Sequence, residues 1–322
     1  MVKHPETLIQ AIRYFSDDTI CRDYVAAIRW PNGVACPTCG SMEVGFIASR
    51  GVWQCKEKHP RKQFSVKVGT IFEDSAVTLD KWLAAMWMLV NDKNGVSSYE
   101  VGRALDVTQG TAWFMLQRLR LALEDGTFNK MHGEVEADET YIGGSARNMS
   151  TARRIKTFGA VKTKGMVGKA GVMGFIQREG PSGHSVVRAV QINDNKTATI
   201  EGHVRDNVEP GTALYTDGLQ SYRRLNAEYV HAIVEHDAHQ YVNGHITTNR
   251  IENFWALLKR SLSGTYVSVE PFHLFRYLDE QVFRFNTREL TDAKRFHAAM
   301  KGIIGKRLTY AQLTASGAQS PA

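Results

Sequence analysis

The order of strand-like and helix-like segments in the second half of the chain constrains its fold most strongly. Five runs rich in β-branched and aromatic residues are candidate strands, at 134–142, 171–178, 184–192, 212–217 and 229–234. Four segments have helical apolar spacing and are candidate helices, at 196–207, 219–227, 250–261 and 271–285. Three successive strands followed by alternating helices and strands predict an α/β domain over this part of the chain.

Three acidic residues stand in distinct contexts within this pattern. Asp138 lies in GEVEADETYIGG, Asp217 ends a predicted strand in ALYTDGLQSY, and Glu252 lies on a predicted helix in NRIENFWALLKR. Two cations held by carboxylates can activate an attacking oxygen and stabilise a leaving oxygen in phosphoryl transfer. Magnesium prefers such oxygen ligands and leaves positions open for substrate phosphate. The two strand acids and the helix acid therefore predict a two-metal phosphoryl-transfer site.

Each acid alone also has a simpler interpretation. Asp138 could belong to an acidic edge strand, and Asp217 before Gly218 could form a turn. Strand alternation places Asp138 and Glu136 on one face and Glu139 on the other, and we expect Asp138 to point inward while its acidic neighbours are solvated. Lys259 follows Glu252 by two helical turns, so it is either a surface partner or a group that contacts phosphate.

The positive charge of the chain is concentrated directly after Asp138. The formal net charge is +7, and the stretch from Thr140 to Arg178 contains no Asp or Glu. Its eight basic residues are Arg147, Arg153, Arg154, Lys156, Lys162, Lys164, Lys169 and Arg178. Without them the net charge would be −1. A polyanion near the candidate site is the natural partner, and a solvated basic loop is an alternative compatible with it.

Composition and length restrict the class of protein further. A chain of 322 residues is too long for one core, so two or three domains are expected. No run of about 18 apolar residues predicts a membrane span, and the N-terminus lacks the apolar region of a secretory signal. Only four cysteines are present, which suggests a reducing compartment. We expect a cytoplasmic protein without a membrane partner.

A cluster of cysteines predicts a structural zinc site near the N-terminus. Cys36 and Cys39 form a CxxC knuckle, Cys55 follows after short β-like pieces, and His59 stands close behind. A Cys₃His set is an ordinary tetrahedral zinc site that is closed to catalysis. Three unrelated buried thiols are the alternative interpretation. Cys21, in an apolar helical context, is predicted to be a core residue.

Residues 97–124 predict a helix-turn-helix, although a plain helical hairpin has a similar pattern. One helix runs from about Ser98 to Leu105, and a second begins after a cap at Thr108 or Thr111. The second helix of such a unit lies in the major groove of DNA. The residues predicted on its outer, base-reading face are Gln117, Arg118 and Arg120.

The predicted organisation is a multidomain α+β chain. It comprises an N-terminal helical segment (1–30), a zinc ribbon (31–72), a helix-turn-helix region (73–127), an α/β catalytic domain (130–290) and a C-terminal tail (291–322).

Several phrases of the chain resemble one branch of the DDE transposases, the bacterial insertion-sequence enzymes with an N-terminal zinc ribbon. The interval of 35 residues from Asp217 to Glu252 resembles the spacing in DDE transposases and retroviral integrases. The resemblance covers about residues 10–290, and its phrases are RWPNGVACPTCG, QFSVKVGTIFEDSAVTLDKW, EADETYIGG, YTDGLQSY and NRIENFWALLKRSLSGTY.

The resemblance implies a ribonuclease H-like catalytic domain that binds terminal inverted repeats, cleaves DNA at the element ends and joins them to target DNA. It implies Asp138, Asp217 and Glu252 as ligands of two Mg²⁺ ions, for which Mn²⁺ can substitute, and Lys259 as a contact to phosphate. It also implies double-stranded DNA as partner and a homodimer or larger assembly. The remaining expected DNA contacts come from the basic segment: Arg147, Arg153, Arg154, Lys156, Lys162, Lys164 and Lys169.

The chain departs from the family pattern in the ribbon, where Lys58 replaces the last cysteine of a second CxxC. Some relatives have Asn as the third catalytic residue, so Asn249 is a lesser candidate for the role given to Glu252. Two rival functions remain at this point. One is a ribonuclease H-like nuclease without strand joining, and the other is a catalytically inert DNA-binding regulator.

Overall fold

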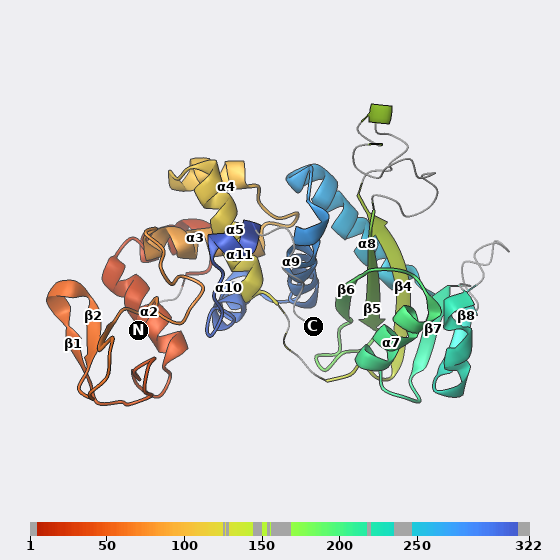
Figure 1. Ribbon diagram of the computed structural model, residues 1–322, viewed down its shortest axis with the longest axis horizontal. Helices are drawn as coiled ribbons and strands as arrows, with labels where there is room; N and C mark the ends of the chain where they lie inside the picture. The colour runs from red at the N-terminus through yellow and green to blue at the C-terminus, as the bar shows by residue number, and fades with distance from the viewer. Residues whose placement is uncertain are drawn as a thin grey trace. The chain divides into compact units, whose positions relative to one another are not determined.

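The computed structural model describes residues 5–124, 126, 129–143, 150–152, 155, 169–217, 220–234 and 247–314. The chain divides into two units, one formed by Met1–Glu124 with Thr287–Ala322 and the other by Asp125–Asn286 (Figure 1). The first unit contains a small sheet and several helices, and the second contains a larger mixed sheet. The predicted fold class, multidomain α+β with an α/β part, is confirmed.

The first unit begins with two helices and a three-stranded antiparallel ribbon. Helices α1 (Leu8–Tyr14) and α2 (Asp18–Arg29) are capped by the side chains of Thr7 and Asp17. The ribbon strands have the order β1-β2-β3. Their bounds are β1 Val44–Ile47, β2 Val52–Cys55 and β3 Gln63–Phe64, with the short helix η1 (Ala48–Arg50) between the first two.

The predicted helical pair follows α3 (Leu79–Asn91); its first helix has the predicted bounds, and its second is capped by Thr108, one of the two predicted caps. Helix α4 (Ser98–Leu105) starts with a capping box in which Ser97 and Glu100 exchange side-chain and backbone hydrogen bonds. Helix α5 (Gln109–Ala122) starts at Thr108, whose hydroxyl accepts from the Thr111 amide. Local capping therefore determines where both helices begin.

Residues after 291, expected to form a tail, contribute helices to the first unit. Helix α10 (Asp292–Lys301) buries Phe296, whose ring centroid lies 5.1 Å from that of Trp87 on α3. The short helix α11 (Tyr310–Thr314) follows.

Among the described residues, no helix combines the length and apolar character that a membrane crossing requires.

The second unit is built on a five-stranded sheet among the described residues, with the order β6-β5-β4-β7-β8. Strands β4, β5 and β6 are antiparallel neighbours, whereas β7 and β8 continue from β4 in parallel. The strand bounds are β4 Glu134–Ile142, β5 Ala170–Gln177, β6 Val186–Ile192, β7 Ala213–Asp217 and β8 Val230–Val234. All five predicted strands are confirmed to within two residues at each end.

Helices cover both faces of this sheet (Figure 1). Their bounds are α7 Thr197–Asn207, η3 Gln220–Ala227, α8 Asn249–Ser261, η5 Leu262–Tyr266, η6 Pro271–His273 and α9 Leu274–Asn286. Helices α7 and η3 pack on one face, and α8 and α9 pack on the other. The segment 219–227, expected as an α-helix, is a 3₁₀ helix from Gln220.

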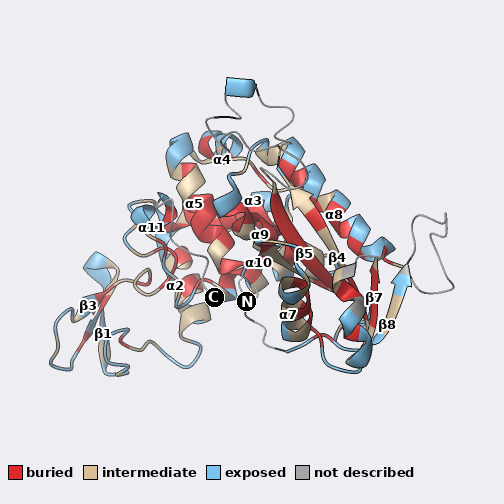
Figure 2. Cartoon of the chain, turned by 45° about the vertical axis from the view of Figure 1, so that its right-hand side comes forward, coloured by how far each residue is buried: buried red, intermediate tan, exposed pale blue. Residues whose placement is uncertain are grey.

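Both faces of β4 are therefore covered, and its residues are buried or partly buried (Figure 2). Val135 and Ala137 belong to the core beneath α7 and η3. Because side chains alternate along a strand, Glu136 and Asp138 point to the opposite face, where α8 lies. The central strand thus carries carboxylates into a protein interior.

Gly174 creates the space that lets α8 approach β4. It pairs with Asp138 across the β4–β5 ladder, and an added Cβ would lie 2.5 Å from Cη2 of Trp255 and 2.9 Å from Cδ1 of Ile251. Both of those residues lie on the buried face of α8. A side chain at this position would therefore push the helix off the sheet.

We expect Gly174→Ala to destabilise the protein by about 1–3 kcal/mol, as overpacking does in a well-filled core. Gly202→Ala is the matched control, because its added Cβ would meet nothing within 4 Å in α7. It should stabilise by about 0.5–1 kcal/mol, since alanine favours helix. Thermal or denaturant unfolding of the two variants measures both effects, and equal stability of the two would contradict the packing role of Gly174.

Candidate active site and metal centres

The adjacent strands β4 and β7 bring the two predicted strand aspartates together. Glu136 pairs with Tyr215 in the parallel ladder, so Asp138 and Asp217 lie two residues further along on neighbouring strands. One carboxylate oxygen from each of Asp138, Glu139 and Asp217 lies within 4.8 Å of the others. These oxygens could hold a divalent cation, for which carboxylates are suitable ligands.

Glu252 approaches the same site from the first turn of α8. Its carboxylate Oε1 accepts a hydrogen bond from Oγ1 of Thr248 at 3.2 Å, and its charge is among the influences that raise the pKa of Asp138. Glu252 is exposed, which leaves room for a ligand. The structure thus brings Asp138 and Asp217 together, whereas Glu252 lies outside the group formed by Asp138, Glu139 and Asp217 and is connected with it by the effect of its charge on the pKa of Asp138.

Asp138 is held by a side chain of α8. Its Oδ2 accepts from Nε1 of Trp255 at 2.9 Å, so α8 contacts the site directly. Burial, followed by the negative charge of Asp217, raises the pKa of Asp138 to about 6. Like charges in a poorly solvated site favour protonation in this way.

Glu139 is a fourth acid of the site that sequence analysis missed. Its expected exposure to solvent is wrong, because it lies beside the core that contains Tyr222, whose hydroxyl donates to its Oε1. Burial and the neighbouring Asp217 and Asp138 charges raise its pKa to about 8, although the Tyr222 hydrogen bond opposes the shift. Alternation along β4 gave the face of Glu139 correctly, but the sequence contains no signal that η3 would cover it.

The expected exposure of Glu136 is also wrong. Its side chain is completely buried and forms an ion pair with Nε of Arg178 at 2.8 Å. Arg178, counted within the basic segment, is only 9% exposed at its side chain and is therefore a structural partner rather than a surface charge.

Lys259 and Asn249 occupy opposite ends of α8. Lys259 is exposed and lines a cavity of about 460 Å³ together with Tyr141, Ile142 and Gly143, which follow the site acids on β4. Asn249 is the first residue of α8 and is exposed. The side chain that would meet an anion in this cavity is Lys259.

The zinc ribbon assembles its four predicted ligands. One ligand atom from each of Cys36, Cys39, Cys55 and His59 lies within 4.8 Å of the others. Sγ of Cys36 is 3.5 Å from Nε2 of His59, and Sγ of Cys39 is 3.6 Å from Sγ of Cys55. Nδ1 of His59 is 2.5 Å from the Pro60 carbonyl, which can only accept, so Nε2 is the nitrogen left for a metal.

Cys21 and Lys58 are not members of this group. Cys21 is buried in α2 and its thiol donates to the Phe15 carbonyl, which confirms its prediction as a core residue. A Cys₃His set thus replaces the second CxxC that Lys58 interrupts.

The outer-face assignment on α5 is wrong for all three predicted base-reading residues. Gln117, Arg118 and Arg120 are at most 4% exposed. Arg118 donates to the carbonyls of Leu308, Ile71 and Glu73, so it connects the two chain segments that form the first unit. The apolar stripe predicted one buried face, but neighbouring segments cover the other face as well. The first turn of α5, with Gln109 and Gly110, is exposed instead.

Most of the predicted basic DNA contacts lie outside the described residues. These are Arg147, Arg153, Arg154, Lys156, Lys162 and Lys164. Lys169 is described and is partly exposed immediately before β5. The role of this segment remains a prediction from its charge.

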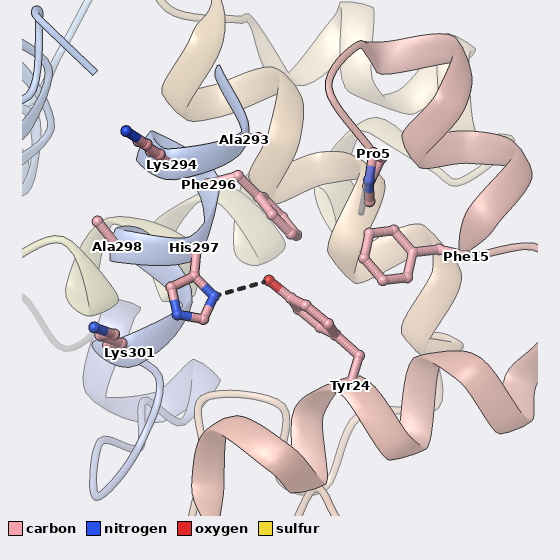
Figure 3. Close-up of a pocket in the computed structure, with 9 residues that line it drawn as sticks. All are labelled: Pro5, Phe15, Tyr24, Ala293, Lys294, Phe296, His297, Ala298 and Lys301. Atoms are coloured by element: carbon pink, nitrogen blue, oxygen red, sulfur yellow. Dashed lines mark hydrogen bonds between the residues drawn. The ribbon is translucent and has the colours of Figure 1, made fainter. Parts of the chain in front are cut away.

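The first unit contains a separate cavity of about 490 Å³ (Figure 3). Phe15, Tyr24 and Phe296 form its aromatic wall, and the Tyr24 hydroxyl lies 3.4 Å from Nδ1 of His297. None of the described residues lining it is a carboxylate or a cysteine, so it is not a further metal site of either kind.

The raised pKa values predict how the stability of the metal-free protein depends on pH. Asp138 and Glu139 have native pKa values of about 6 and about 8, whereas unfolded Asp and Glu titrate near 3.9 and 4.3. Between those limits the native state holds protons that the unfolded chain has released. The free energy of unfolding should therefore fall as pH rises from about 4 to 8.

Asp138→Asn should reduce this fall, because it removes one of the two responsible carboxyls. Denaturant unfolding of both proteins in the presence of a chelator, at several pH values, measures the difference. Identical pH profiles for the variant and the parent would show that Asp138 titrates normally.

Comparisons with known proteins agree with the two kinds of metal-binding group. Residues 16–59 match the family described as a transposase zinc-ribbon domain, and residues 130–286 match an ISXO2-like transposase domain. The chain is 27% identical over 259 residues to an uncharacterized protein in transposable element ISH50 of Halobacterium salinarum, covering 78% of this chain and 85% of that protein.

A second relative is an uncharacterized transposase-like protein of Haemophilus influenzae, 32% identical over 105 residues. That match covers 32% of this chain and 84% of the relative. The zinc-ribbon match contains all four residues of the Cys₃His group, and the transposase-domain match covers nearly all of the second unit, which carries the carboxylates. This chain belongs to the insertion-sequence transposases that combine an N-terminal zinc ribbon with an ISXO2-like DDE transposase domain.

Proposed function

We propose that the protein cleaves DNA at the ends of its own insertion sequence and joins those ends to target DNA. The observation that supports this proposal is the meeting of Asp138 and Asp217 on the neighbouring strands β4 and β7, with Glu252 presented by α8. Water would attack a phosphodiester bond at the element end and release a 3′-hydroxyl. That hydroxyl would then attack a phosphodiester of the target, exchanging one bond for another.

The residues of the site fit a pair of Mg²⁺ ions, for which Mn²⁺ would substitute. Bound divalent cations would supply charge stabilisation for the attacking and leaving oxygens. Asp138 is the central ligand in the proposal, because its carboxylate meets those of Asp217 and Glu139 and the charge of Glu252 also raises its pKa. Cation binding would also compensate the repulsion that raises the pKa values of Asp138 and Glu139.

The protein's own side chains would position DNA around this site. Lys259, in the cavity beyond the end of β4, would contact a backbone phosphate. The basic segment after Asp138 would follow the strands, because clustered Lys and Arg neutralise phosphates and displace counterions. A homodimer or larger assembly would hold the two element ends together.

The ribbon and the helix-turn-helix would recognise the terminal repeats. Zinc held by Cys36, Cys39, Cys55 and His59 would stabilise the ribbon. Since the second half of α5 is buried, the exposed first turn around Gln109 is the better candidate for contact with bases. Recognition helices commonly use their N-terminal residues for this purpose.

Two rivals are separated by assays on DNA. A nuclease would cleave element ends without joining them, and an inert regulator would bind without cleaving. A strand-joining assay with cloned element ends therefore tests the proposal directly.

We expect Asp138→Asn, Asp217→Asn and Glu252→Gln each to abolish strand cleavage in Mg²⁺ while leaving DNA binding intact. Each substitution removes a negatively charged ligand without loss of volume, so the loss of activity should exceed the roughly 100-fold found when a residue that hydrogen-bonds to a metal ligand is changed. Asp206→Asn is the control, because Asp206 is an exposed acid at the end of α7. Near-normal cleavage by any of the three variants would remove that acid from the site.

Purified protein should contain stoichiometric zinc, and His59→Ala should lose it together with ribbon stability. A structural zinc contributes folding energy directly in so small a module. Cys21→Ala should retain the metal, because its thiol lies in the helical core. Metal analysis and thermal unfolding give both readouts, and full zinc retention by His59→Ala would assign the fourth ligand elsewhere.

A further inference from the structure

The first turn of α8 begins without the side-chain cap that such a helix ordinarily needs. The first amides of a helix have no partners within the helix, and a Ser, Thr, Asp or Asn at the cap usually satisfies one of them. Thr248 stands at the cap of α8, but its side chain makes no capping hydrogen bond. Its hydroxyl donates to the Glu252 carboxylate instead.

Glu136 supplies the missing acceptor from another element. Its Oε2 accepts from the amides of Arg250 and Ile251 at 3.0 and 3.1 Å. A carboxylate at a helix N-terminus is favoured both by these hydrogen bonds and by the helix dipole. A buried side chain of β4 thus caps the helix that carries Glu252.

Arg178 holds Glu136 in this position and also holds the chain that enters the helix. Its Nε donates to Glu136 Oε1 at 2.8 Å, and its guanidinium donates to the Thr247 carbonyl at 2.9 Å. Arg250 returns a hydrogen bond from its guanidinium to the Arg178 carbonyl at 2.9 Å. A single cation therefore connects the capping carboxylate with the residue just before Thr248.

These contacts connect the two halves of the candidate site. Glu136 lies two residues before Asp138 on the same face of β4, and the helix turn that it caps contains Glu252. One turn later, Trp255 donates to Asp138. Helix α8 thus contacts β4 through the amides of residues 250–251 and through Trp255, which lie before and after Glu252 along the helix.

We propose that Glu136, supported by Arg178, is a positioning residue that sets where α8 presents Glu252 to the carboxylates of the strands. The inference rests on the proposed function for the role of Glu252, although the capping itself can be measured independently. Glu136 contacts neither DNA nor cation in this role. It acts through the helix N-terminus.

The test compares Glu136→Gln with Glu280→Gln. Glu280 is also completely buried and is paired with an arginine, Arg284, but it lies on α9. The first readout is amide hydrogen exchange of peptides covering residues 248–258. We expect faster exchange there in Glu136→Gln, unchanged exchange in the β5 peptides, and no such local change in Glu280→Gln. Unchanged exchange at 248–258 overturns the proposal, whatever the protein does to DNA.

The second readout is Mn²⁺ affinity, measured by calorimetry or electron paramagnetic resonance. Glu136→Gln should weaken binding by roughly 10- to 100-fold, the range found for residues that orient metal ligands. Glu280→Gln should bind Mn²⁺ normally. If Glu136 acts through Glu252, the double variant Glu136→Gln/Glu252→Gln should bind no more weakly than Glu252→Gln alone.

The outcomes separate this inference from the proposed function. Additive losses in the double variant would show that Glu136 does not act through Glu252 and would overturn the inference, with the transposase proposal intact. Full cleavage and Mn²⁺ binding by Glu252→Gln would reject Glu252 itself, and the positioning role would fail with it. If Glu136→Gln does not fold, Arg178→Lys keeps the buried charge but loses the guanidinium bridge to Thr247, and it should show the same local exchange and a smaller loss of affinity.

Discussion

The contact between β4 and the first turn of α8 determines the geometry of the candidate active site. A metal site of this kind needs carboxylates from separate elements within a few ångströms, and a helix on a sheet can slide or tilt unless something fixes it. Here the helix amides donate to Glu136, and the indole of Trp255 donates to Asp138. Gly174 leaves the space in which that indole lies. Polar contacts and packing thus position the first two turns of α8.

The burial of β4 gives the site its electrostatic character. Carboxylates at a strand end in solvent would repel one another weakly, because water screens them. Asp138 and Glu139 instead have raised pKa values, since burial disfavours their charged forms and Asp217 is nearby. Such a site favours proton or cation binding. The same strand carries Glu136, whose charge is matched by Arg178. Arg178 also pairs with Glu134, so the charges of Glu134 and Glu136 have a partner within the protein, whereas Asp138 and Glu139 could bind a cation.

The two candidate metal-binding groups would have different physical roles. The Cys₃His set lies in a small three-stranded ribbon, where a closed tetrahedral zinc would provide folding energy. The carboxylate group lies on a sheet that has an apolar core on each face. Removal of zinc should therefore affect the folding of the ribbon, whereas removal of a divalent cation from the carboxylates should affect catalysis.

Patterns in the sequence predicted the fold class, the strands of the second unit, the bounds of α4, a cap for α5, the four residues that meet in the ribbon, and Asp138 and Asp217 as neighbours. These predictions depend on local features: apolar periodicity, capping side chains and the spacing of Cys, His and Asp. Which neighbours of those residues are buried depends on the tertiary structure. Glu136 and Glu139 were expected in solvent, and Gln117, Arg118 and Arg120 on an exposed face, yet all five are wholly or largely enclosed. Periodicity identifies the two faces of a strand or helix. The segments that cover those faces come from distant parts of the chain, so a local pattern does not predict which of them pack there.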